Sequence, residues 1–149
     1  MKVEIICNFG GIYSDIAMEF IKCHGSGNDF ILIDATKYAD LSKAEWSDFA
    51  RKACCRTSGI GSDGLLLLVR HEDRVYGMDM LNPDGTHAEM CGNGIRCVAR
   101  LVRERYISDD FFTLTSGGGL YPTRRAELIN GEIEAYGVDI KVRLTSPDF

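Results

Sequence analysis

The chain has 149 residues, of which 45% are hydrophobic and 26% are charged, and this is the composition of a single globular domain with a buried core. Its net charge of −5 and isoelectric point near 5.2 argue against a partner with a phosphate backbone, so we expect no nucleic-acid binding. No window reaches the roughly 18 apolar residues of a membrane span, so we expect no membrane partner.

The six cysteines raise three alternatives, namely a disulfide framework, a zinc site or free thiols. The N-terminal stretch MKVEIICNFGGIYSDIA has no usable apolar run of a secretory signal, so we expect a reduced, cytoplasmic protein. Zinc requires cysteine or histidine ligands at fixed spacing. Because Cys54 and Cys55 are adjacent and the three histidines stand alone, we expect no metal.

The first predicted elements are two strands and a helix. EFIKCHG and NDFILIDA predict strands on either side of a glycine turn, and the second of them is short, apolar and β-branched, as a buried strand is. Ser42 predicts the start of a helix through SKAEWSDFARKACCR (42–56), because Glu45 completes a capping box. The apolar spacing of this helix places Cys54 on its packing face, as a core cysteine.

After the glycine-rich break GIGSDG, the pattern returns to strands. LLLLV predicts a buried strand and RVYGMDMLN its partner in a hairpin. NPDG (82–85) predicts a turn with Pro83 at its second position and Gly85 at its fourth. Further along, FFTLTS predicts a strand, and two more strand-like runs flank an Asn130–Gly131 turn. Many strands with two helices favour an α+β fold, a mostly antiparallel sheet wrapped around a central helix.

EMCGNGIRCVARLV (89–102) places a cysteine directly before Gly-Asn-Gly, where a helical pattern begins. Apolar residues recur at helical spacing after it, at Ile95, Val98, Ala99, Val102 and Tyr106. A helix N-terminus presents unpaired N–H groups and a partial positive charge, which favour a thiolate. Gly92 and Gly94 allow a ligand close to the backbone, whose N–H groups could hold a carboxylate. A half-buried structural cysteine at Cys91 is the alternative.

Cys97 lies six residues after Cys91. On a helix this separation corresponds to a rotation of about 600°, so the two side chains point in different directions. A disulfide between them is geometrically poor, and we expect Cys97 to serve packing.

Three segments closely resemble the N-terminal half of diaminopimelate epimerase, in the order and with the spacing of that family. They are KCHGSGNDFILID (22–34), GIGSDGLLLL (59–68) and MLNPDGTHAEMCGNGIRCVARLV (80–102). The patterns HGxGNDF and NxDGxxAEMCGNGxRC favour this family over proline racemase-like and phenazine-biosynthesis-like isomerases, which share the general fold. The resemblance implies an epimerase-like N-terminal domain over 18–149, with residues 1–17 as an extension and no second domain.

The resemblance implies a cofactor-independent isomerase that interconverts LL- and meso-diaminopimelate for lysine and peptidoglycan precursors. In the family, one thiolate removes the α-proton and a second thiol delivers a proton to the opposite face. Cys91 matches the first-half catalytic cysteine, and Asn28 and Asn82 match asparagines that contact the substrate. Gly92 and Asn93 match the backbone pair that binds the reacting carboxylate. Both Asn28 and Asn82 also suit turns, so a structural role is their alternative.

Other positions near these motifs have different expectations. Asp29 and Asp63 are expected to hold loops rather than to act on substrate. Gly64 departs from the family pattern, because some members carry a substrate-contacting glutamine there. Arg96 suits either helix packing or the field around the carboxylate.

The sequence contains no second motif of the Cys-Gly-Thr-Gly type, so the expected source of the second thiol is open. One hypothesis is an epimerase half that is inactive alone. Another is a homodimer in which two Cys91 residues meet across a two-fold axis. The third is a non-catalytic or binding domain of the same fold.

Overall fold

The computed structural model describes residues 18–72, 74–108, 111–127 and 134–138. The predicted extension over 1–17 and the predicted turn at Asn130–Gly131 lie outside these residues. The elements are β1 (Ile21–Gly25), β2 (Asn28–Asp34), η2 (Ala35–Lys37), α1 (Lys43–Ala53), β3 (Gly64–Glu72), β4 (Val75–Leu81), β5 (His87–Ala88), α2 (Gly92–Arg105), β6 (Phe111–Ser116), β7 (Gly119–Glu127) and β8 (Glu134–Val138). Within these ranges, no helix has both the length and the apolar character needed to cross a membrane.

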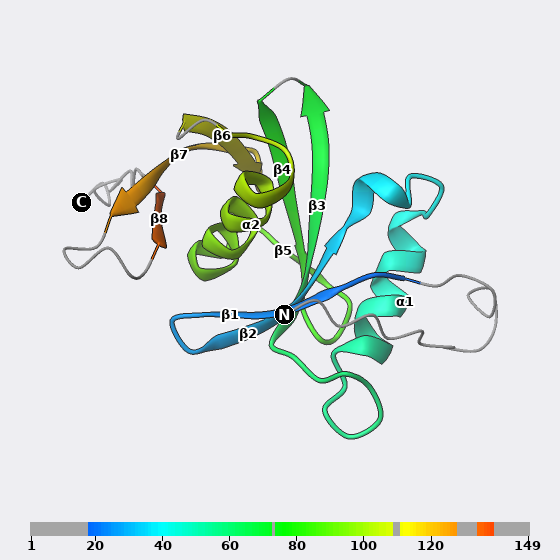
Figure 1. The fold of residues 1–149 in the computed structure, drawn as a ribbon. Helices are drawn as coiled ribbons and strands as arrows, with labels where there is room; N and C mark the ends of the chain where they lie inside the picture. The colour runs from blue at the N-terminus through cyan, green and yellow to red at the C-terminus, as the bar shows by residue number, and fades with distance from the viewer. Residues whose placement is uncertain (1–17, 73, 109–110, 128–133, 139–149) are drawn as a thin grey trace, which may run out of the picture.

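The strands form one sheet in the order β1-β2-β3-β4-β6-β7-β8, with β5 paired to β4. This sheet curls around α2, which contacts β1, β2, β3, β4 and β8, while α1 lies outside it (Figure 1). Most neighbouring strands are antiparallel, but β2–β3 and β4–β6 are parallel. Parallel neighbours need a crossover, and α1 and α2 supply the two crossovers. The expected α+β fold, with a mostly antiparallel sheet around a central helix, is confirmed.

The neighbouring strands β2 and β3 are buried on both faces. On β2, Phe30 and Leu32 pack in the core beneath α2, whereas Ile31 and Ile33 pack in the core beneath α1. The four leucines of β3 divide between the two cores in the same alternating way. A strand that is covered on both sides needs apolar residues at every position, which explains the uninterrupted runs FILI and LLLL.

Helix α1 begins as predicted. The Ser42 hydroxyl accepts the Glu45 backbone N–H at 3.3 Å, and the Glu45 carboxylate accepts the Ser42 backbone N–H at 2.7 Å. This is the reciprocal capping box that the Ser-x-x-Glu spacing predicted. The buried residues of the helix face the core beneath α1, and they are Trp46, Phe49, Ala50 and Ala53.

The predicted end of α1 is wrong, because the helix stops at Ala53 instead of continuing to 56. The returning loop supplies the reason, since the N–H groups of Gly61 and Ser62 donate to the carbonyls of Ala53 and Cys54 at 2.9 and 3.1 Å. The last carbonyls of the helix are therefore bonded to the returning loop instead of to a further helical turn. Cys54 is therefore the buried C-cap, as a core cysteine, and Cys55 lies in the loop rather than in the helix.

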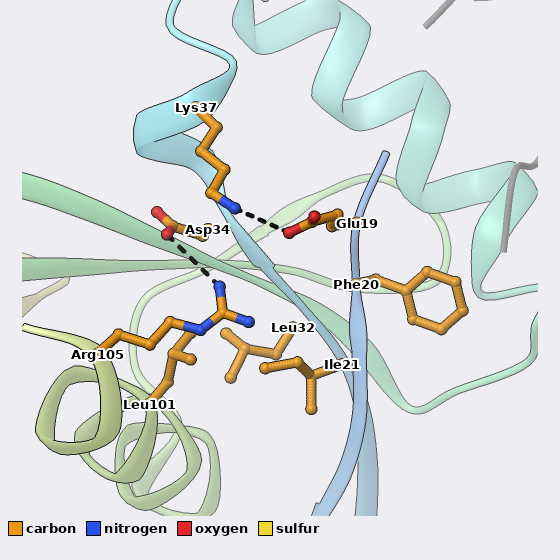
Figure 2. A pocket seen from close by; sticks show the side chains of 8 residues that line it. All are labelled: Glu19, Phe20, Ile21, Leu32, Asp34, Lys37, Leu101 and Arg105. Carbon is orange, nitrogen blue, oxygen red and sulfur yellow. Dashed lines mark hydrogen bonds and ion pairs between the residues drawn. The ribbon is translucent and has the colours of Figure 1, made fainter. Parts of the chain in front are cut away.

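Helix α2 packs its predicted apolar stripe into the core that lies between this helix and the sheet. In that core, Ile95, Val98, Ala99 and Val102 are fully buried. At its C-terminal end, Arg105 lies 3.8 Å from the buried carboxylate of Asp34 (Figure 2). The two ends of the helix therefore differ in character. The C-terminal end is anchored on β2 by charge, and the N-terminal end carries Cys91.

Candidate functional site

One end of the sheet collects three of the predicted site segments. Because β2 and β3 pair in parallel and β3 and β4 pair antiparallel, the starts of β2 and β3 meet the end of β4. Asn28 opens β2, Asp63 directly precedes β3, and Asn82 directly follows β4. From this end, β5 pairs with the last residues of β4 and leads the chain toward Cys91 and α2.

Cys91 is the N-cap of α2, in an extended conformation with φ −139° and ψ 106°. Its sulfur accepts the backbone N–H of Gly94 at 3.4 Å, and its carbonyl accepts that of Ile95 at 2.9 Å. The half-buried thiol thus takes the place that an oxygen side chain usually has at a helix start. It lies at the positive end of the helix dipole, next to the first-turn N–H groups of Gly92 and Asn93.

The side chains of Asn28 and Asn93 are joined directly. The Asn93 amide nitrogen donates to the Asn28 amide oxygen at 2.7 Å, although the residues are far apart in the chain. On either side of this pair, Arg96 donates to the Asn93 oxygen, and the Asn28 nitrogen donates to Asp63 at 3.3 Å. Each asparagine nitrogen carries a second N–H, so the pair can present donors to an acceptor such as a carboxylate.

Asp29 and Asp63 hold the loops around this pair, in agreement with the structural role expected for them. Arg56 donates to both carboxylates, at 2.6 Å to Asp29 and 2.8 Å to Asp63. Lys22 donates to Asp29 at 2.6 Å, and Asp63 also accepts the Asp29 backbone N–H at 3.0 Å. Hydrogen bonds from Arg56, and then from Lys22, hold the pKa of Asp29 well below its usual range.

Asn82 is held in its own turn rather than in the Asn28–Asn93 pair. Its amide nitrogen donates to the Thr86 hydroxyl at 3.0 Å, and its backbone N–H donates to the Thr86 carbonyl at 2.8 Å. Its carbonyl accepts the Gly85 N–H at 2.9 Å, which closes the predicted NPDG turn. The structure places Asn82 at the same end of the sheet as Asn28 but gives it separate partners.

Gly64 is buried at the start of β3, where a side chain has little space. A Cβ atom built there lies 2.9 Å from the Met80 terminal methyl and 3.1 Å from the Leu81 carbonyl oxygen. A larger residue at this position would therefore require Met80 to move. In this chain, the Met80 side chain occupies the space that a side chain at position 64 would need.

Sequence reasoning left Arg96 open and did not single out Ser26 or Gly25. Arg96 donates to the Ser26 hydroxyl at 2.9 Å and so ties the β1–β2 turn to the first turn of α2. A Cβ atom on Gly25 would lie 2.9 Å from the Asn93 carbonyl oxygen, which explains the glycine by close approach of strand and helix. The HGSG stretch could have predicted this close contact between strand and helix, because glycine and serine have little or no side chain to keep another segment away.

The pocket of Figure 2 lies at the other end of α2, between β1, β2 and the helix C-terminus. Its rim carries two oppositely charged pairs, Lys37 with Glu19 at 2.8 Å and the wider pair of Arg105 with Asp34. None of the predicted site residues lines it. Among the residues that the structure describes, no three His, Cys, Asp or Glu side chains gather as a metal site requires. The expected metal-free site stays a prediction.

Comparison with known proteins gives a family match over most of the chain. The profile of the family described as diaminopimelate epimerase matches residues 20–130. Diaminopimelate epimerase of Carboxydothermus hydrogenoformans is 52% identical over 89 residues, which are 60% of this chain and 32% of that protein. The enzyme of Halothermothrix orenii is 39% identical over 137 residues, which are 89% of this chain and 45% of that protein. The chain thus spans less than half the length of these curated relatives.

Solved structures share the fold at low sequence identity. A Bacillus anthracis phenazine biosynthesis protein of the PhzF family aligns with 81% of this chain and 38% of its own, at a TM-score of 0.61 and 20% identity. A hydroxyproline epimerase from Agrobacterium vitis aligns with 81% of this chain and 40% of its own, at a TM-score of 0.56 and 14% identity.

Proposed function

Because the chain belongs to the diaminopimelate epimerase family, we propose that it supplies one half of the active site of a cofactor-independent isomerase. This isomerase interconverts LL- and meso-diaminopimelate for lysine and peptidoglycan precursors. The observation that supports the proposal is the placement of Cys91 at the N-cap of α2, beside the Asn28–Asn93 pair. A cytoplasmic location belongs to the same proposal.

In the proposed reaction, the Cys91 sulfur acts as the base that removes the α-proton of the substrate. This proton is weakly acidic, so negative charge develops on the substrate carboxylate and must meet donors that are already in place. The N–H groups of Gly92 and Asn93 are such donors, at the positive end of α2. Asn28 would add an amide N–H, and Asn82 would contact the substrate from the end of β4.

Inversion by two bases needs a second thiol on the opposite face of the α-carbon. The other described cysteines do not suit this role, because Cys54 is buried under α1 and Cys55 lies in the loop after it. Cys23 and Cys97 pack against the core beneath α2. We therefore propose that the second thiol comes from another half, either a second cysteine-bearing domain or a second copy of this chain.

Isotope exchange tests the proposal. The chain is incubated with LL-diaminopimelate in D₂O, and α-deuterium uptake and meso product are followed by NMR and chiral chromatography. Cys91→Ala removes the proposed base, while Cys55→Ala removes a loop thiol outside the site and is the matched control. We expect exchange in the wild type and in Cys55→Ala, and loss of exchange in Cys91→Ala.

The pattern of exchange also separates the sources of the second thiol. Exchange with inversion supports a competent homodimer, and sedimentation then has to show a dimer. Exchange without inversion supports a half that needs another cysteine-bearing domain. If no exchange occurs and Cys91→Ala binds the substrate no differently, the catalytic role is wrong and a non-catalytic domain of this fold is the answer.

A further inference from the structure

Cys23 on β1 and Cys97 on α2 meet at the interface between sheet and helix. Both are free and half-buried, and both pack against the core beneath α2. Their side chains hydrogen-bond to each other. The Cys97 sulfur also lies against β1 itself, because a Cβ atom built on Gly25, two residues after Cys23 on the same face, would lie 3.4 Å from it. The two thiols are thus neighbours although they are distant in the chain.

The surroundings assign different protonation to the two sulfurs. The hydrogen bond to Cys97, followed by burial, raises the pKa of Cys23. The same hydrogen bond, with the positive charges of Arg96 and Arg100, lowers the pKa of Cys97 despite its burial. Cys97 is therefore the sulfur that ionises first, and Cys23 keeps the shared proton. A thiolate beside a second thiol is the arrangement that thiol–disulfide exchange requires.

We propose that Cys23 and Cys97 form an oxidation site that reacts with small disulfides of the glutathione type and closes to a Cys23–Cys97 disulfide. The Cys97 thiolate attacks one sulfur of the oxidant, whose disulfide bond breaks and releases one thiolate. Cys23 then gives up its proton, attacks the Cys97 sulfur and expels the second thiol. The two protein thiols lose two electrons and the oxidant gains them, ending as two thiols.

The other described cysteines are poor partners for either sulfur. Cys54 is buried in the separate core beneath α1, on the other face of the sheet. Cys55 is held by hydroxyl groups in its own loop. Cys91 points away from Cys97 along the helix, since a separation of six positions turns the side chain by about 600°. Geometry therefore selects one pair.

A disulfide at this place would join β1 to α2 one helical turn beyond Asn93. The backbone of Asn93 already lies against Gly25, so the covalent bond would restrain the part of α2 that carries Cys91. This inference goes beyond the proposed function, because the disulfide forms or fails to form whether or not the domain is catalytic.

The test uses the full chain, reduced and then treated with oxidised glutathione under native conditions. Acid quenching, alkylation of remaining thiols and mass spectrometry of intact protein and peptides follow. We expect the wild type to yield a peptide that links Cys23 with Cys97 and that weighs two hydrogen atoms less than the two reduced peptides together. Cys55→Ser is the matched control and should form the same link.

The variant Cys23→Ser traps the first step. Without the resolving thiol, the peptide that contains Cys97 should gain one glutathione and keep it, whereas Cys97→Ser should form no link at Cys23. A linked peptide that joins other cysteines, or a wild type that keeps glutathione without forming the link, would overturn the proposal. Circular dichroism shows whether each variant is folded, and if one is not, the wild-type peptide map alone decides.

Discussion

Cys54 and Cys55 are adjacent in the chain, yet their sulfurs meet opposite environments. Burial in the core beneath α1 raises the pKa of Cys54. Cys55 lies in the following loop, where the Ser58 hydroxyl donates to its sulfur at 3.1 Å and the Thr57 hydroxyl lies at 3.4 Å. These hydrogen bonds, with that of Ser58 the strongest, lower the pKa of Cys55 to about 6. Reactivity at this scale follows from the partners of each sulfur rather than from residue type.

The Cys55 thiol should therefore be alkylated with an acid-shifted pH profile. We expect its rate of reaction with iodoacetamide to reach half of its plateau near pH 6, because the thiolate is the nucleophile. Peptide mass spectrometry at a series of pH values measures this rate. Ser58→Ala removes the main hydrogen bond and should move the midpoint upward. A wild-type midpoint near the ordinary value of 9.0 would contradict the prediction.

At the scale of elements, the starts of both helices are set by side chains that cap them. Ser42 caps α1 with an oxygen, and Cys91 caps α2 with a sulfur. Sulfur is the weaker acceptor, so α2 depends more on packing than on its cap. Its stability comes from the apolar stripe that the sheet encloses (Figure 1).

Removal of the oxygen cap should weaken α1. We expect Ser42→Ala to lower the free energy of unfolding by about 1 kcal/mol, because the hydroxyl that accepts the Glu45 backbone N–H and donates to the Glu45 carboxylate is lost. Urea denaturation measures the change. Ser42→Thr keeps a hydroxyl acceptor and is the control, so equal losses in the two variants would argue against the capping role.

Truncation of the apolar stripe of α2 should cost more. Ile95 is fully buried between the helix and the sheet, and we expect Ile95→Ala to lower the unfolding free energy by about 2 to 5 kcal/mol. The matched control is Leu120→Ala on β7, because that side chain is 71% exposed and should change stability by less than about 0.5 kcal/mol. Thermal and urea unfolding give both values. Similar losses in the two variants would show that α2 does not form the centre of the core.

At the scale of the whole molecule, one charged network ties together segments that are far apart in the chain. It joins Lys22 of β1, Asp29 of β2, Arg56 in the loop after α1 and Asp63 before β3. The network adjoins Asn28, which donates to Asp63 at 3.3 Å. It therefore links the stability of the sheet end to the orientation of the proposed site.

This network should make stability depend on pH in the acid range. The folded-state pKa of Asp29 is depressed below its unfolded value of about 3.9, so its contribution is present above that pH and is lost as pH falls toward the folded pKa. Asp29→Asn should lower stability at neutral pH and flatten the decline below about pH 4. Urea unfolding at several pH values measures this.

Salt supplies the control for the Asp29 prediction. The pairs are partly exposed, since the Asp29 side chain keeps 29% of its accessible surface, so the effect should be modest and should shrink as ionic strength rises. An acid decline of the same steepness in wild type and Asp29→Asn would show that the network contributes nothing to the folded state.

The amino-acid sequence by itself determined the features that depend on local chemistry. The capping box at Ser42, the NPDG turn and the helix that follows Cys91 each rest on hydrogen bonds or spacing within a few residues. The buried strands were predictable from their apolar runs, because both of their faces are covered. The position of the candidate thiol was also predictable, because Cys91 and the helix that it caps are neighbours in the chain.

Only the tertiary structure decided what depends on contacts across the chain. The parallel pairings of β2 with β3 and of β4 with β6, and the early end of α1, follow from how the crossovers and the returning loop dock. It also joined Asn28 to Asn93, left Asn82 with Thr86 and brought Cys23 to Cys97. These features depend on packing and hydrogen bonds between residues that are distant in the chain. The neighbours of a residue in the sequence do not determine such contacts.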